Sequence, residues 1–128
     1  MKILWDTHTF LWFVNGSPLL SSFARNLIES PTSVNLLSMA SVWEMAIKHS
    51  TGKLSFSQPF EVFVPQQIAL NGIEVLGIKQ EHVNVIATLP LHHKDPFDRL
   101  LVAQCIVEQI ALISVDAAFD AYPVQRRW

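Results

Sequence analysis

The sequence lacks the features of a membrane-spanning, secreted or disulfide-stabilised protein. Its longest early apolar run, residues 10–14, is closed by a turn-forming segment at 15–18, and no run approaches the ~18 residues of a membrane span. Asp6 and His8 interrupt the region where a signal peptide would need an unbroken apolar stretch. The single cysteine, Cys105, lies in an apolar stretch, which predicts a buried thiol in a reducing compartment. We therefore expect a cytoplasmic protein with no membrane partner.

Glycine is also scarce, with 4 residues in the whole chain. Neither of the glycine-rich phosphate-binding patterns, G-x-G-x-x-G and G-x-x-x-x-G-K-[ST], occurs. The serine-centred pattern G-x-S-x-G of many hydrolases is absent as well. These absences remove most of the support for a nucleotide cofactor and for acyl transfer.

An excess of positive charge is missing too, because Lys and Arg number 9 against 11 Asp and Glu, for a net charge of −2. The molecule as a whole therefore has no basic field that would attract nucleic acid. Half of the residues are hydrophobic and 16% are charged, a composition that can form a core and excludes disorder. The length of 128 residues fits one domain over residues 1–128.

Short apolar runs alternate with helical patterns along the chain. The runs predict strands at 2–5, 34–37, 73–78 and 111–115, and the patterns predict helices at 10–14, 21–29, 38–48, 80–88 and 95–109. Either Thr7 or Thr9 is expected to cap the first helix. Met39, Ala40, Trp43 and Ile47 are expected to form the apolar face of the third helix. This order predicts an α/β sandwich around a mostly parallel sheet, with ligands beyond the carboxyl ends of its strands.

Four acidic residues are candidates for a site at that edge. Asp6 and Asp116 directly follow strands, Asp98 lies in the first turn of an apolar helix, and Glu44 lies on the helix at 38–48. Each also has an ordinary explanation: aspartates cap helices and form turns, and Glu44 is spaced to pair with Lys48 on a helix surface.

If the four carboxylates converge, their mutual repulsion requires compensation by protons or cations. Mg²⁺ or Mn²⁺ is the natural partner of such oxygen ligands, and it would allow the cluster to bind a polyanion such as a phosphodiester. A zinc site built from Asp6, His8, His92 and His93 is an alternative, although the spacing matches no tight zinc pattern.

Four segments of the chain resemble the PIN-domain family, and more closely the VapC-type toxins of bacterial type II toxin–antitoxin pairs. They are Ile3-Leu4-Trp5-Asp6-Thr7-His8, Ser41-Val42-Trp43-Glu44-Met45-Ala46-Ile47-Lys48, His93-Lys94-Asp95-Pro96-Phe97-Asp98-Arg99-Leu100-Leu101-Val102-Ala103-Gln104 and Ser114-Val115-Asp116-Ala117-Ala118-Phe119. The resemblance runs nearly end to end. It implies a three-layer α/β/α sandwich with a mostly parallel sheet, and a metal-dependent endoribonuclease.

The resemblance also implies roles for individual residues. The catalytic, metal-binding quartet would be Asp6, Glu44, Asp98 and Asp116, with Mg²⁺ or Mn²⁺ as the cofactor. Thr7 and Ser114 would orient these ligands, whereas Asp95 would cap a helix. Arg99, Lys48 and His93 would approach RNA phosphates, although Arg99 suits an ion pair or a solvated position equally well. Val115 stands where the family often has a basic residue.

The partners implied by the resemblance are an RNA substrate, a cognate antitoxin protein and a second copy of the chain in a homodimer. Four tryptophans and eight phenylalanines are compatible with such interfaces, and equally with a dense aromatic core. Two other functions compete. A non-catalytic PIN-like binding module would have no reason to keep four repelling carboxylates. A phosphoacceptor signalling domain would need an Asp directly after a central strand. Ser38, not an Asp, follows the second predicted strand.

Overall fold

The computed structural model describes residues 1–128 and contains one five-stranded sheet in which every strand pair is parallel. The strand order is β3-β2-β1-β4-β5. The strands are β1 (Lys2–Trp5), β2 (Val34–Ser38), β3 (Glu74–Leu76), β4 (Ala111–Ile113) and β5 (Arg126–Arg127). Leu4 at the centre of β1 pairs in register with Leu36 and Leu112. The predicted parallel sheet is thus confirmed, with a two-residue fifth strand that the sequence did not predict.

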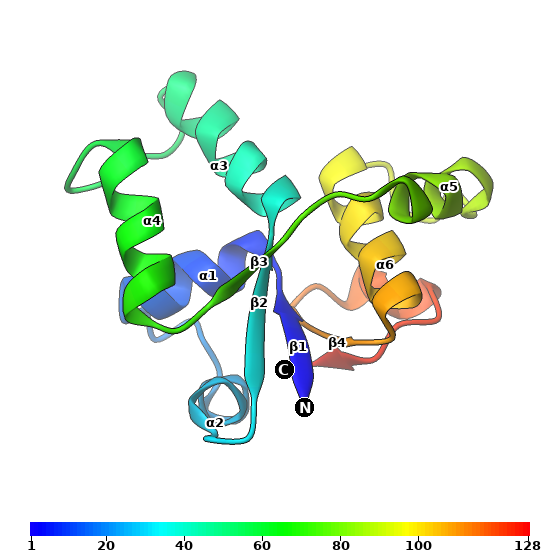
Figure 1. The fold of residues 1–128 in the computed structure, drawn as a ribbon, viewed down its shortest axis with the longest axis horizontal. Helices are drawn as coiled ribbons and strands as arrows, with labels where there is room; N and C mark the ends of the chain where they lie inside the picture. The colour runs from blue at the N-terminus through cyan, green and yellow to red at the C-terminus, as the bar shows by residue number, and fades with distance from the viewer.

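Helices cover both faces of this sheet (Figure 1). They are α1 (Thr7–Val14), α2 (Ser22–Glu29), α3 (Met39–Ser50), α4 (Phe60–Leu70), α5 (Gln80–Thr88) and α6 (Pro96–Glu108), with a short 3-10 helix η1 (Ala117–Ala121). Helices α1 to α4 lie on one side of the strands, and α5 and α6 lie on the other (Figure 1). The three-layer α/β/α sandwich is therefore confirmed. None of the helices combines the length and the apolar character needed to cross a membrane.

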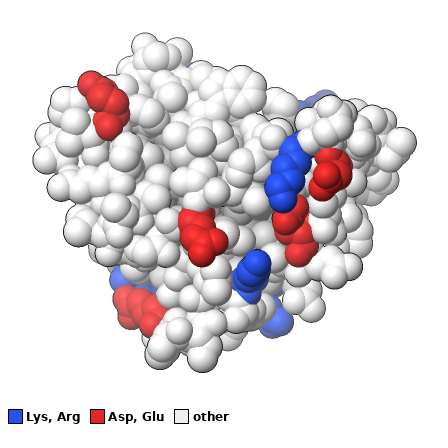
Figure 2. Space-filling view, in the orientation of Figure 1, with Lys and Arg blue, Asp and Glu red and all other residues white.

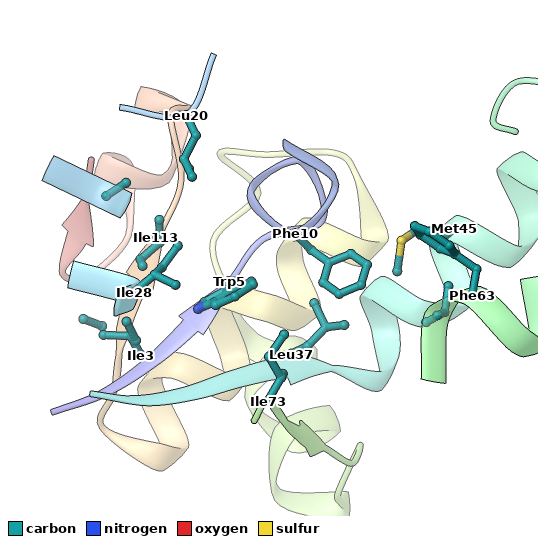
Figure 3. Packing of buried hydrophobic residues seen from close by; sticks show 13 residues of the cluster. Ile3, Trp5, Phe10, Leu20, Ile28, Leu37, Met45, Phe63, Ile73 and Ile113 are labelled. Atoms are coloured by element: carbon teal, nitrogen blue, oxygen red, sulfur yellow. The ribbon is translucent and has the colours of Figure 1, made fainter. Parts of the chain in front are cut away.

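Successive side chains of each strand point to opposite faces of the sheet, so the core consists of two clusters, one on each face. Ile3 and Trp5 of β1 pack with α1 to α4, whereas Leu4 between them packs with α6 and η1. Figure 3 shows the first cluster, in which Phe10 of α1 projects toward Met45 of α3. The central strands β1 and β4 are buried on both sides, as their short, nearly continuous apolar runs predicted, whereas Glu74 and Val75 of the edge strand β3 are exposed.

The first helix is capped by Asp6 rather than by the predicted Thr7 or Thr9. The Asp6 carboxylate accepts hydrogen bonds from the backbone N–H of Thr9 and from its hydroxyl, at 2.8 and 2.6 Å. An aspartate in extended backbone at this position satisfies an N–H of the first turn as well as a threonine would. The cap therefore ties Asp6 to the end of β1 and the start of α1.

The predicted apolar face of α3 was wrong for three of its four residues. Ala40 is buried, but Met39, Trp43 and Ile47 are among the exposed large apolar residues. The helix buries Ala40, Ser41, Glu44 and Met45 instead. Helical periodicity finds an apolar stripe but cannot tell a core-facing stripe from one that is left on the surface. Because a different face of α3 from the predicted one is buried, Glu44 points inward, toward the ends of the strands.

Candidate metal centre

A cavity of about 140 Å³ lies beyond the carboxyl ends of β1 and β4. It is lined by Asp6, Thr7, His8, Glu44, Lys48, Asp95, Asp98, Val115, Asp116 and Phe119. All four predicted carboxylates therefore meet in one place, although they come from four separate segments. Parallel strands bring this about, because their carboxyl ends share one edge of the sheet.

One half of the cluster, Asp6 and Glu44, is buried and supplied with hydrogen-bond donors. Asp6 is 6% exposed and holds the two Thr9 donors described above. Glu44 is 8% exposed; one carboxylate oxygen accepts from the Thr7 hydroxyl at 2.6 Å and the other lies 2.9 Å from Lys48 Nζ. The same Thr9 hydroxyl oxygen also lies 3.0 Å from the Ile113 carbonyl oxygen at the end of β4. The positions of these two carboxylates are fixed by neighbouring groups.

The other half, Asp98 and Asp116, is more exposed and lies near the His93 ring. Asp98 Oδ2 lies 3.1 Å from His93 Nε2, and Asp116 Oδ2 lies 3.5 Å from the same nitrogen. Burial raises the pKa of Asp98 to about 7, and the negative charges of Asp95, Glu44 and Asp6 add to the rise. His93 acts in the opposite direction on this pKa. The ionised form of Asp98 is therefore less favourable here than in a solvated aspartate.

The donor atoms around the cavity suit a hard divalent cation. Five carboxylates and one lysine line it, and His93, Asp98 and Asp116 offer ligand atoms within 4.8 Å of one another. Oxygen-rich sets of this kind bind Mg²⁺ or Mn²⁺. The raised pKa of Asp98 fits the same conclusion, because it marks negative charge that a cation would neutralise. Asp6, Glu44, Asp98 and Asp116 are the residues that could hold the ion.

The two predicted orienting hydroxyls contact the acidic residues, each in its own way. Thr7 donates to Glu44, as given above, whereas Ser114 accepts the backbone N–H of Asp116 at 3.0 Å. Both residues are buried. Asp116 also accepts the N–H of Ala118 and so caps η1. Asp95 caps α6, accepting from the N–H groups of Phe97 and Asp98, in agreement with the sequence expectation.

The residues expected near RNA phosphates lie in three different environments. Lys48 pairs with Glu44 at the cavity and stays 38% exposed. His93 lies between the two aspartates. Arg99 instead donates to the backbone carbonyls of Leu89 and Pro90, at 3.1 and 3.0 Å, and to the Tyr122 hydroxyl. The Arg99 side chain is thus neither in an ion pair nor simply solvated; it holds the loop before α6.

Sequence reasoning missed several residues that shape the site. Thr9 fixes Asp6, Phe119 stacks on the His93 ring with centroids 5.8 Å apart, and Tyr122 holds the loop that carries His93. Only Thr9 had a signal in the sequence, since it stands three residues after a helix-capping Asp. The alternative zinc ligands do not gather: His8 lines the cavity, but the ring of His92 packs edge-on against Tyr122.

The sequence model of the PIN domain family matches residues 3–125. The chain therefore belongs to the PIN domain family. No curated protein matches the sequence.

Solved structures share the fold along almost the whole chain. VapBC2 from Rickettsia felis, bound to a DNA fragment from its promoter, has a TM-score of 0.75 at 15% identity, covering 99% of this chain and 98% of the other. VapBC-1 from nontypeable Haemophilus influenzae gives 0.69 at 15% identity, with coverage of 99% and 97%. A toxin–antitoxin complex from Klebsiella pneumoniae gives 0.63 at 18%, with coverage of 94% and 92%. At these identities the similarity establishes the fold, a PIN fold that also occurs in toxin–antitoxin complexes.

Proposed function

We propose that the protein is a metal-dependent endoribonuclease that acts as the toxin of a type II toxin–antitoxin pair. The observation that carries the proposal is the convergence of Asp6, Glu44, Asp98 and Asp116 on one cavity at the carboxyl end of a parallel sheet. Like charges gathered in this way are costly unless a cation binds them. Mg²⁺ or Mn²⁺, when bound, would activate water and stabilise the charge that develops on a phosphodiester.

The side chains divide this work between them. Asp6, Asp98 and Asp116 hold the ion, directly or through water. Glu44, fixed by the Thr7 hydroxyl, completes the site or orients the attacking water. Lys48 neutralises Glu44 and keeps part of its ammonium exposed at the cavity, where it meets a phosphate of the substrate. We assign Arg99 to the loop rather than to RNA.

The charge balance is compatible with an RNA partner. Without the four site carboxylates, about seven acidic residues remain against 9 basic ones, so the rest of the chain is slightly positive. On the face shown in Figure 2 the basic side chains are few and separated. Affinity for RNA would therefore depend on the metal-loaded site more than on a broad basic surface.

Purified protein incubated with RNA tests the proposal directly. We expect cleavage with Mg²⁺ or Mn²⁺, and none with EDTA or in Asp98→Asn. Asp120→Asn is the matched control, because Asp120 is exposed, pairs with Arg126 and lies outside the cavity. Cleavage that is equal in wild type, Asp98→Asn and EDTA would overturn the proposal.

The alternative is a PIN-like module that binds a partner without cleaving RNA. It predicts that Asp98→Asn leaves both RNA binding and the cellular effect of the protein intact. Growth arrest by the wild-type chain that disappears in Asp98→Asn, but not in Asp120→Asn, would decide against this alternative.

The proposed antitoxin needs an apolar surface, and α3, α4 and β3 provide one. A groove of about 400 Å³ runs between α3, α4 and β3, lined by Met39, Val42, Phe60, Glu61, Val64, Pro65, Ile68, Ala69 and Val75. An amphipathic antitoxin segment would fit there. Homodimer formation and a cytoplasmic location, which buried Cys105 suits, complete the proposal. Light scattering of the chain alone and with its antitoxin would report both assemblies.

A further inference from the structure

One of the four tryptophans of the chain exposes a large part of its side chain to solvent. Trp43 of α3 is 55% exposed. Trp5 is fully buried, and Trp12 and Trp128 are half-buried and pack edge-on against each other. Single exposed apolar residues are common on protein surfaces, so the exposure of Trp43 points to a site only together with its surroundings.

A second aromatic residue, from another helix, holds the Trp43 ring. Phe97 of α6 is half-buried, its ring centroid lies 5.0 Å from that of Trp43, and the two ring planes cross at 83°. This edge-to-face geometry is a favourable one for aromatic pairs, so Trp43 is oriented although it is exposed. An edge-to-face contact covers one face of one ring and leaves both faces of the other ring free of that contact. The pair therefore offers a flat aromatic surface to a planar ligand.

The Trp43–Phe97 pair lies next to the proposed metal centre. Trp43 directly precedes Glu44 in the chain and Phe97 directly precedes Asp98, and both carboxylates line the acidic cavity. The pair thus joins α3 to α6 where each helix contributes its acidic residue. Lys48 of α3 also lines the cavity and is 38% exposed. A flat apolar surface, a cation and a candidate metal site together match the base and the phosphates of a nucleotide.

We propose that Trp43, held by Phe97, stacks on an unpaired base of the RNA substrate beside the phosphodiester at the metal centre. Every base has a planar π face, so stacking of this kind binds single strands with little sequence preference. The bases of a duplex are already stacked and paired, and the Trp43–Phe97 pair cannot reach their faces. The substrate is therefore single-stranded at the cleavage site. The inference deepens the proposed function and rests on it in taking RNA as the substrate.

A second copy of the chain is the competing occupant of this surface. The apolar groove assigned to the antitoxin includes Met39 and Val42 of α3, but neither Trp43 nor Phe97 lines it. The pair adjoins the charged cavity instead, with carboxylates directly after both rings and Lys48 on the same helix. The cores of protein–protein interfaces are depleted of charged residues. These surroundings favour a nucleotide over a protein surface.

Affinity for a single-stranded RNA of about 10 nucleotides tests the proposal. Binding is measured with Ca²⁺, a divalent ion that takes oxygen ligands, and a gel shows whether the RNA stays intact. Trp43→Leu keeps an apolar side chain without the ring and should weaken binding about 10-fold, whereas Trp43→Phe keeps a stacking face and should stay within about 3-fold of wild type. Phe23→Leu is the matched control, because Phe23 is 53% exposed on α2, away from α3 (Figure 1).

The same RNA annealed to its complement separates stacking from phosphate contacts. Trp43→Leu should bind this duplex as wild type does, so that the loss of affinity is confined to the single strand. Trp43 emission should change when the single strand binds. That change should be absent in Trp43→Phe, although the variant still binds the RNA.

Several results would overturn the proposal. They are no binding of the single strand by wild type, an unchanged affinity in Trp43→Leu, and an equal loss for single strand and duplex. Dissociation of a wild-type homodimer in Trp43→Leu, seen by light scattering, would assign the ring to a contact between copies and contradict the proposal as well.

Failure of the nuclease and failure of the stacking site give different results. RNA that binds through Trp43 but is not cleaved with Mg²⁺ or Mn²⁺ would remove the nuclease and support the stacking site. Cleavage with an affinity that does not depend on Trp43 would support the nuclease and overturn the stacking site.

Discussion

The two halves of the acidic cluster differ in how their charges are compensated. Asp6 and Glu44 are buried; Asp6 accepts from Thr9, and Glu44 accepts from Thr7 and pairs with Lys48. Asp98 and Asp116 lie 3.1 and 3.5 Å from one imidazole nitrogen, and the pKa of Asp98 rises to about 7, whereas Asp116 also accepts the Ala118 N–H. Within one four-carboxylate site, the charge of Asp98 is therefore compensated least.

This difference separates stability from function. In the buried half, removing a carboxylate leaves buried donors unpaired and costs stability. At Asp98, removing the carboxylate relieves repulsion and burial of charge, so the metal-free protein gains stability while it loses a ligand for the cation. Changes at Asp98 and in the buried half should thus affect stability with opposite sign, and both should reduce activity.

The largest expected effect is the loss of RNA cleavage in Asp98→Asn. An amide cannot supply the anionic ligand, and we expect activity to fall by more than about 100-fold, since even outer ligand partners cost about 10- to 100-fold. Initial cleavage rates at saturating Mn²⁺ measure the effect, with Asp120→Asn as the control. A decrease below 10-fold would mean that Asp98 is not a ligand.

Stability of the metal-free protein should change with pH through Asp98. The pKa of Asp98 in the folded protein, about 7, lies above the ordinary aspartate value of 3.8. The unfolded chain therefore releases its proton first, and folding stability falls as pH rises from about 4 to 7. The full shift corresponds to about 4 kcal/mol, of which we expect about 2 after solvent screening. Denaturant unfolding in EDTA should show Asp98→Asn more stable than wild type at pH 8, and a variant less stable there would contradict the account.

The opposite sign is expected for Asp6→Ala. It removes the cap of α1 and leaves the Thr9 N–H and hydroxyl without their acceptor. We expect a loss of about 1–2 kcal/mol in the free energy of unfolding. Ser21→Ala, which removes the cap of α2 far from the cavity, is the matched control: it should cost about 1 kcal/mol and leave cleavage unchanged. Equal activity in the two variants would show that Asp6 is only a cap.

The smallest effect should come from Thr7→Val, which keeps the shape of the side chain but loses the donor to Glu44. We expect a loss of about 1 kcal/mol in stability and a decrease in cleavage of about 10-fold. Thr88→Val, at an exposed position near the end of α5, should change neither. A Thr7→Val variant with wild-type cleavage would show that Glu44 needs no orienting hydroxyl.

Local patterns predicted the parallel sheet, and they placed Asp6 and Asp116 at the ends of strands, where the edge of a parallel sheet lies. They left the convergence of these two residues with Glu44 and Asp98 as a condition, and the resemblance to the PIN family supplied the full set of four. The sequence did not predict the face of α3 that is buried, since Met39 and Trp43 are as apolar as core residues and yet exposed. Nor could it predict that Tyr122 and Arg99 would hold the His93 loop, because those contacts join residues that only tertiary folding brings together.

Calorimetric titration of Mg²⁺ or Mn²⁺ just below pH 7, in two buffers of different ionisation enthalpy, shows whether a bound ion displaces the proton of Asp98. At that pH the Asp98 carboxyl, with a pKa of about 7, is about half protonated. We expect that a divalent ion binds and releases about half a proton, and that Asp98→Asn binds more weakly and releases none. Absence of divalent-ion binding, or binding with the same proton release in wild type and Asp98→Asn, would contradict the proposed metal centre.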